Sequence, residues 1–119
     1  MKISITSHGK ELNSNVDERF GRAQGFIIFD DETKEFKYID NSKNLSTMQG
    51  AGIQSAKCMI DEGVQVLITG HVGPKAFTTL EQGDIRIMIG AEGKVEQAID
   101  DYKKNKLKEA TGANVKGHW

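Results

Sequence analysis

The sequence predicts a single α/β domain built on a mixed five-stranded sheet with helices on its faces. Two observations predict this class: short alternating or apolar runs typical of strands, and a second half in which strands alternate with apolar residues at helical spacing. The chain has 119 residues, enough for one modest core without disulfide bonds. Its 37% hydrophobic and 28% charged residues are ordinary for a globular protein. We therefore expect one domain over residues 1–119.

The first half of the chain is predicted to contain three strands. Residues 2–7 alternate polar and apolar side chains, as a strand does. Residues 25–30 and 35–40 predict a β-hairpin, because the polar turn 31–34 separates two runs rich in aromatic and β-branched residues. Before this hairpin, Arg19-Phe20-Gly21-Arg22 places two arginines around Phe-Gly, where glycine permits a close backbone approach.

The middle of the chain is predicted to be a helix. Ile53, Ala56 and Ile60 recur at the spacing of one helix face, and Gly63 is a suitable stop. This phase places Cys58 on the opposite, outward side of the helix.

The remaining chain is predicted to alternate strand and helix. Residues 64–69 form an apolar, β-branched run, and Pro74 suits the first turn of the helix that follows. Residues 84–90 predict the next strand, and residues 95–102 place apolar side chains on one face of a final helix. Residues 107–119 have no clear period, and we expect them to form a C-terminal tail that can be flexible.

The order of these elements predicts the topology of the sheet. The two strand–helix–strand crossovers should be right-handed, and the strands that they join should be parallel. With the first strand in the middle and the hairpin on one side, the strand order along the sheet is 3-2-1-4-5. This is the arrangement of three-layer, ribonuclease-H-like folds.

That order predicts a binding site beyond the ends of the first and fourth strands. The chain leaves these neighbouring strands in different directions, so the gap between them is a topological switch point, where α/β proteins tend to bind ligands. His8 follows the first strand and His71 the fourth, and the Arg19–Arg22 loop should reach the same edge. Arginines and helix N-termini favour anions, and imidazoles are ligands for borderline-soft metals. An anionic metal–sulfur cluster would satisfy both preferences, and so would a phosphate or a nucleotide.

Charge and cysteine content narrow the class of partner and the compartment. The net charge is -1, without the basic excess typical of nucleic-acid binders. No apolar run approaches the roughly 20 residues that span a bilayer, and the N-terminus does not resemble a signal peptide. One cysteine cannot form an internal disulfide. We therefore expect a cytoplasmic protein that binds neither nucleic acid nor membrane.

Four segments together resemble the dinitrogenase iron–molybdenum cofactor-binding family, the NifX-like group that also includes the C-terminal domain of NifB-type proteins and the orange proteins. The segments are Asp17-Glu18-Arg19-Phe20-Gly21-Arg22-Ala23, Gly50-Ala51-Gly52-Ile53, Gly63-Val64 and Thr69-Gly70-His71-Val72-Gly73-Pro74-Lys75-Ala76. The resemblance extends through the helix at 95–102 and implies a ribonuclease-H-like fold, in agreement with the strand order.

The resemblance implies a non-catalytic protein that carries an anionic metal–sulfur cluster. The implied cargo is the iron–molybdenum cofactor or its precursor or, as in the orange-protein branch, a molybdenum–copper sulfide cluster. Some nitrogenase-associated members have a cluster-binding histidine before Phe-Gly and a cysteine shortly after, where this chain has Arg19 and Ala23. The departure favours ionic holding of the cluster by Arg19 and Arg22. Expected partners are the cluster and cofactor-assembly proteins, with the chain a monomer or weak dimer.

The candidate site gathers the residues expected at this edge of the sheet. The candidate cofactor-binding residues are His8, Arg19, Phe20, Gly21, Arg22, Met48, Gly50, Gly52, Gly70, His71 and Gly73, with His71 and His8 as candidate metal ligands.

Each of these residues also has an ordinary structural explanation. A loop histidine can simply bond nearby backbone, a methionine can fill a gap, and the glycines can serve close packing of helix on strand. Cys58, which is not among the candidates, has no residue near it in the sequence that would lower its thiol pKa.

Two other functions compete with that of a carrier. A ribonuclease-H-type nuclease needs several carboxylates around metal ions, one of them on the first strand, and residues 2–7 contain none. A nucleotide- or protein-binding regulatory module could use the same crevice, and the sequence leaves it open.

Overall fold

The computed structural model describes residues 1–45 and 50–113. Within them, the sheet has six strands in the order β3-β2-β1-β4-β5-β6. The pairs β1–β4 and β4–β5 are parallel, whereas β1–β2, β2–β3 and β5–β6 are antiparallel. The strands are β1 (Lys2–Ser7), β2 (Gly25–Asp30), β3 (Phe36–Asp40), β4 (Val66–Ile68), β5 (Arg86–Ile89) and β6 (Lys108–Glu109).

The predicted order of the first five strands is confirmed, but the predicted number of strands is wrong by one. The sixth strand, β6, lies in what was predicted to be a tail without regular structure. It consists of two exposed residues paired with Met88 and Ile89 of β5. The Ala110 N–H donates to the Ile87 carbonyl at 2.8 Å and extends the pairing. Two residues are too few to show a strand alternation in the sequence. The position of this strand is set by its pairing with β5.

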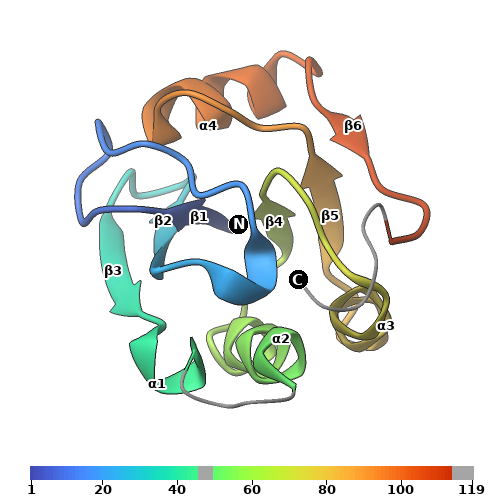
Figure 1. Ribbon diagram of the computed structural model, residues 1–119. Coiled ribbons are helices and arrows are strands. Elements are labelled where there is room, and N and C mark those ends of the chain that lie inside the picture. Colours follow the sequence, from blue (N-terminus) through green and yellow to red (C-terminus); the bar gives the residue numbers. More distant parts are fainter. Residues whose placement is uncertain (46–49, 114–119) are drawn as a thin grey trace.

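Helices cover both faces of the sheet, as the ribonuclease-H-like prediction requires (Figure 1). Helices α2 (Ala51–Asp61) and α3 (Pro74–Gln82) cover one face, and α4 (Val95–Lys103) covers the other. Two short segments complete the first layer: the 3-10 turn η1 (Phe20–Arg22), which packs on α2, and α1 (Ser42–Leu45). None of the described helices is long and apolar enough to cross a membrane.

The central strand β1 supplies side chains to both cores. Ile3 and Ile5 belong to the cluster beneath α4. Ser4 and Thr6 alternate with them and therefore face α2 and α3. Both side chains are polar, yet both are fully buried. The helices on both faces thus cover a strand whose apolar side is thin in sequence.

The predicted apolar stripe of α2 is wrong in phase. The helix buries Ala51, Ser55, Ala56 and Met59, whereas Ile60 is 39% exposed. The small buried side chains allow η1 and α3 to pack closely on the helix, and this contact sets its rotation. Cys58 is half-buried against the core rather than outward, and burial raises the pKa of its thiol.

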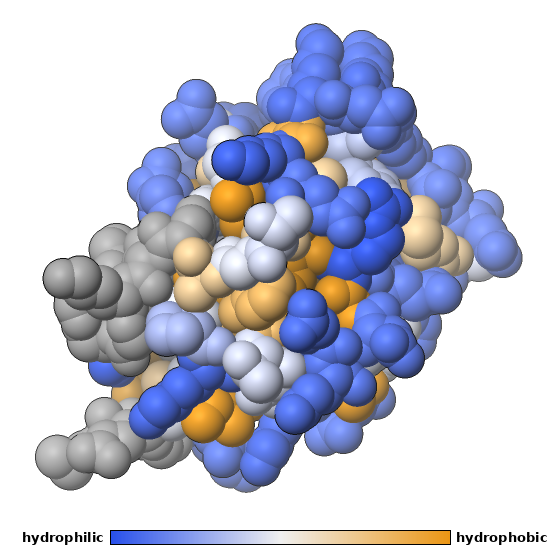
Figure 2. Space-filling model, turned by 90° about the vertical axis from the view of Figure 1, so that its right-hand side faces the viewer, coloured by the Kyte–Doolittle hydropathy of each residue, from blue (hydrophilic) through white to orange (hydrophobic). Residues whose placement is uncertain are grey.

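The side of the molecule that carries α3 and β6 shows a small apolar patch among polar side chains (Figure 2). A groove of about 280 Å³ lies there between the helix and the edge strand. Its apolar lining comes from Phe77, Ile85, Ile87 and Ala110. An ion pair at 2.7 Å between Arg86 and Glu109 holds β6 at the edge of this groove.

Candidate functional site

The ends of β1 and β4 lie side by side at one edge of the sheet. The two strands are parallel neighbours, with Ser4 opposite Leu67 and Ile5 opposite Ile68. Beyond the last paired residues, the hydroxyls of Thr6 and Thr69 are 2.9 Å apart and hydrogen-bonded. The chain then turns into the loops that carry His8 and His71. The structure therefore confirms that β1 and β4 are adjacent, as a switch point at this edge requires.

The loop containing Arg19 is joined to the loop containing His71 by backbone hydrogen bonds. The His71 N–H donates to the Glu18 carbonyl at 2.7 Å, and the Phe20 N–H donates to the His71 carbonyl at 3.1 Å. Together they form a parallel bridge between Arg19 and His71. The structure thus brings together two segments that lie about fifty residues apart in the chain.

Gly70 makes this approach possible. A Cβ atom at this position would lie 2.7 Å from the Glu18 carbonyl oxygen and 2.9 Å from the Glu18 Cα. Backbone atoms cannot move aside as a flexible side chain can, so the position requires glycine. The close approach alone accounts for a glycine at position 70.

Within η1, buried and exposed residues have different roles. Phe20 and Gly21 are buried, and the Phe20 ring packs on Phe26 with centroids 5.8 Å apart. Arg19 is about half exposed and Arg22 half-buried. Phe20 therefore anchors the turn in the core, while the flanking arginines lie at the surface.

Asp17 organises this loop, although it is not among the candidate residues predicted from the sequence. Its side chain is only 1% exposed, and its two oxygens accept the N–H groups of Arg19 and Gln24, each at 3.2 Å. It also pairs with His8 Nδ1 at 3.5 Å and with Arg19 Nε at 3.7 Å. An acidic residue two positions before an arginine is usually solvated, so the sequence alone gives little sign of this role.

Two helices begin at this edge with glycine at the N-cap. Gly50 precedes α2 with a left-handed φ of 84°, and Gly73 precedes α3. Glycine offers no side chain to cap the helix N–H groups, so a cap at these two positions must come from elsewhere. Helix α4 differs, because the Val95 and Glu96 N–H groups donate to loop carbonyls, each at 2.9 Å.

The remaining predicted residues divide into described and undescribed ones. Gly52 lies in the first turn of α2 and is half-buried. Gly73 is buried, and His71 is half-buried. Met48 lies outside the described residues.

The arrangement favours an anion over a bare metal ion. Among the described residues, no three His, Cys, Asp or Glu side chains are grouped so as to hold a metal ion. The edge instead combines two arginines with the N-termini of α2 and α3, which favour negative charge, and two histidines, which offer ring nitrogens. A metal held here would therefore need to bring most of its own ligands.

The fold and this edge define a small ribonuclease-H-like α/β domain in which the Arg19 and His71 loops meet at the topological switch point. A family model described as dinitrogenase iron-molybdenum cofactor matches residues 1–105. The chain belongs to this family.

Solved structures and a curated relative agree with this assignment. The apo form of the orange protein from Desulfovibrio gigas is 38% identical, with a TM-score of 0.93 and coverage of 96% of each chain. A putative NifB protein from Thermotoga is 32% identical, with a TM-score of 0.84 over 96% of this chain and 97% of that one. An uncharacterized protein of Methanocaldococcus jannaschii is 28% identical over 80% of this chain and 82% of its own length.

Proposed function

We propose that this protein is a non-catalytic carrier of an anionic metal–sulfur cluster, held at the edge where β1 and β4 end. The observation that carries the proposal is the backbone bridge between Arg19 and His71, which fixes a cationic loop beside the switch point. Arg19 and Arg22 then supply positive charge and hydrogen-bond donors, and His8 and His71 supply imidazole nitrogens at the same edge.

The cargo class follows from the donor set together with the family. A cluster with bridging sulfides brings its own ligands, so it requires from the protein mainly charge, donors and one or two side-chain ligands. An iron–molybdenum cofactor, its precursor, or a molybdenum–copper sulfide cluster meets this description. His71 and His8 are the side chains that we propose as metal ligands.

The absence of a suitable carboxylate on β1 supports a binding rather than a catalytic role. Metal-dependent nucleases of this fold class need acidic residues around their ions. Lys2–Ser7 contains none, and the nearby buried carboxylate of Asp17 accepts two backbone N–H groups and lies beside His8 and Arg19.

Reconstitution tests the proposal. The protein is incubated with tetrathiomolybdate and copper(I), desalted, and analysed for visible absorption and bound molybdenum. We expect the wild type to retain colour and metal, and the Arg19→Ala/His71→Ala variant to lose most of both. Lys106→Ala removes a positive charge from an exposed position just after α4 and serves as the control. Equal retention by the wild type and the double variant would refute the proposal.

A nucleotide- or protein-binding regulatory module is the second candidate function. The glycine N-caps of α2 and α3 favour it, because helix N-termini also bind phosphates. Calorimetric titration with ATP distinguishes the two candidates. ATP binding that Arg19→Ala weakens, in a protein that retains no molybdenum, would favour the module.

A further inference from the structure

We propose that Asp17 is a positioning residue, which presents selected nitrogen atoms of Arg19 and His8 to the anionic cargo. The inference rests on the proposed carrier function and adds a residue that does not itself contact the cargo. With 1% of its side chain exposed, the carboxylate is inaccessible to a bulky ligand. Its negative charge would also repel an anion, so its presence at this edge needs another explanation.

The carboxylate first fixes the backbone of the loop. Asp17 Oδ1 accepts the Arg19 N–H and Oδ2 accepts the Gln24 N–H, each at 3.2 Å. These two residues flank η1, so one side chain holds both ends of the turn. Asp17 is itself tied to β1, because its N–H donates to the Thr6 carbonyl at 2.9 Å and its own carbonyl accepts from the Thr6 hydroxyl.

The carboxylate also orients the guanidinium of Arg19. The Arg19 Nε lies 3.7 Å from Asp17 Oδ1. A guanidinium is planar, so engaging Nε on one side directs the two Nη groups away from the carboxylate. Among the described residues, these Nη groups have no hydrogen-bond or ion-pair partner, and the side chain is 48% exposed. Four N–H donors thus remain for an anion at the rim.

His8 is oriented by the other oxygen. Its Nδ1 lies 3.5 Å from Asp17 Oδ2, and its side chain is 45% exposed. A carboxylate beside Nδ1 favours the tautomer with the proton on that nitrogen, which leaves the Nε2 lone pair for a metal or a donor. Asp17 therefore selects which atom of His8, as well as which atoms of Arg19, can meet the cargo.

Asp17→Asn tests the inference with a readout that needs no cargo. Asparagine keeps one acceptor oxygen and nearly the same volume but removes the charge. In ¹⁵N NMR spectra recorded at about pH 8, above the ordinary histidine pKa, we expect wild-type His8 to carry its proton on Nδ1. In Asp17→Asn the population should shift toward the Nε2–H tautomer. An unchanged tautomer in a folded variant would overturn the inference.

The second readout is the affinity for tetrathiomolybdate with copper(I). We expect Asp17→Asn to weaken binding about tenfold or more, as loss of an outer-shell partner typically does. Asp31→Asn, which removes an equal charge at the opposite end of β1, should bind like the wild type. If the wild type binds and folded Asp17→Asn binds equally well, the positioning role alone is refuted; if the wild type retains no cargo, the carrier function fails.

Arg19→Lys keeps the test valid if Asp17→Asn does not fold. Lysine keeps the positive charge at a half-exposed position but lacks the planar fork that Asp17 orients. We expect this variant to lose about tenfold in affinity, which corresponds to one pair of charge-assisted hydrogen bonds. An affinity equal to that of the wild type would show that charge alone suffices and would overturn the proposal.

Discussion

At the scale of single residues, two of the buried hydroxyls of β1, those of Ser4 and Thr6, have opposite environments. Thr6 Oγ1 donates to the Asp17 carbonyl and bonds the hydroxyl of Thr69. Ser4 faces the same side of the strand, and its Oγ has no hydrogen-bond partner within the described residues. A buried hydroxyl without a partner costs stability, whereas a bonded one contributes to it.

Replacing each hydroxyl should therefore have opposite effects. Ser4→Ala should leave the free energy of unfolding unchanged or raise it by up to about 1 kcal/mol. Thr6→Val should lower it by about 1–2 kcal/mol, because two hydrogen bonds are lost at nearly constant volume. Urea unfolding followed by circular dichroism measures both. A loss of stability in Ser4→Ala comparable to that in Thr6→Val would contradict the description of the two sites.

Gly70 gives a second prediction at this scale. Gly70→Ala should lower the free energy of unfolding by about 1–3 kcal/mol, the usual cost of overpacking. The cause is the 2.7 Å approach between the new Cβ and the Glu18 carbonyl oxygen. Gly112→Ala is the matched control, since a Cβ there meets no atom within 4 Å. Equal urea midpoints for the two variants would show that the two loops are not held as closely as described.

The sequence predicted which segments meet at this edge better than it predicted the contacts within them. It pointed to Arg19, His71 and His8, because the linear sequence shows histidines directly after two predicted strands and arginines on both sides of Phe-Gly. It missed Asp17, because only the folded loop surrounds that carboxylate with donors. It also placed Cys58 outward, where packing of α2 instead half-buries it.

At the scale of secondary-structure elements, strong periodicity was reliable and short elements were not. The hairpin of β2 and β3 lies within the predicted ranges, α3 begins at the predicted Pro74, and α4 extends one residue beyond the predicted range, because these patterns repeat over whole elements. The two-residue β6 and the rotation of α2 depend on contacts with other elements. Such contacts leave no pattern in the local sequence.

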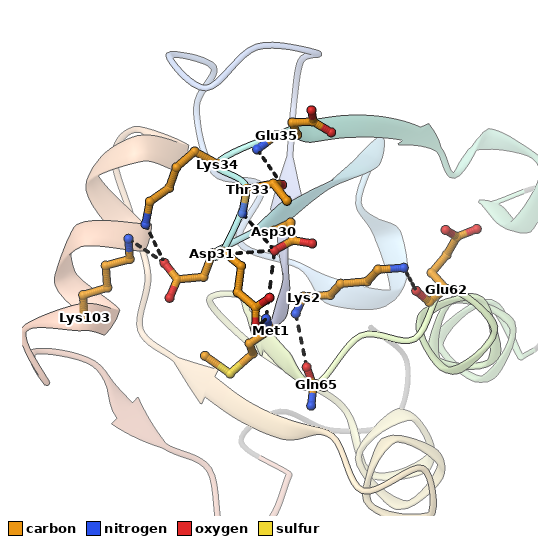
Figure 3. A network of polar contacts seen from close by, with 11 residues as sticks. Met1, Lys2, Asp30, Asp31, Thr33, Lys34, Glu35, Glu62, Gln65 and Lys103 are labelled. Atoms are coloured by element: carbon orange, nitrogen blue, oxygen red, sulfur yellow. Dashed lines mark hydrogen bonds and ion pairs between the residues drawn. The ribbon is translucent and has the colours of Figure 1, made fainter.

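The end of α4 is joined to the β2–β3 turn by an ion-pair network (Figure 3). Asp31 accepts from Lys103 at 2.7 Å and from Lys34 at 3.2 Å. These lysines, Lys103 first, hold the pKa of Asp31 below its ordinary value. The same carboxylate holds the pKa of Lys103 above its ordinary value. Both shifts stabilise the folded state in the pH range where Asp31 and Lys103 are both charged.

The network predicts a pH-dependent stability. Because the pKa of Asp31 is lower in the folded state, its contribution is present at neutral pH and is lost as the pH falls through that pKa. Asp31→Asn should therefore melt at a lower temperature than the wild type near pH 7, and the gap should close on acidification. Thermal unfolding across a pH series measures this. A gap that stays constant as the pH falls would show that Asp31 does not act through its charge.

At the scale of the whole molecule, the two ends of β1 have different surroundings. At its start, the terminal ammonium of Met1 lies 3.7 Å from Glu32 and 4.0 Å from Asp30, within the network that fixes the turn (Figure 3). At its other end, the chain gathers the cationic loops. The strand order predicted from the sequence accounts for this division, because it makes β1 and β4 parallel neighbours.

The central claim is that an anionic cluster binds where β1 and β4 end, and amide chemical-shift mapping tests it most directly. Tetrathiomolybdate and copper(I) are both diamagnetic, so ¹H–¹⁵N spectra can follow the titration. The largest shifts are expected at residues 19–22 and 70–73 and at the start of α2. Shifts confined to the groove between α3 and β6, or to the β2–β3 hairpin, would contradict the account.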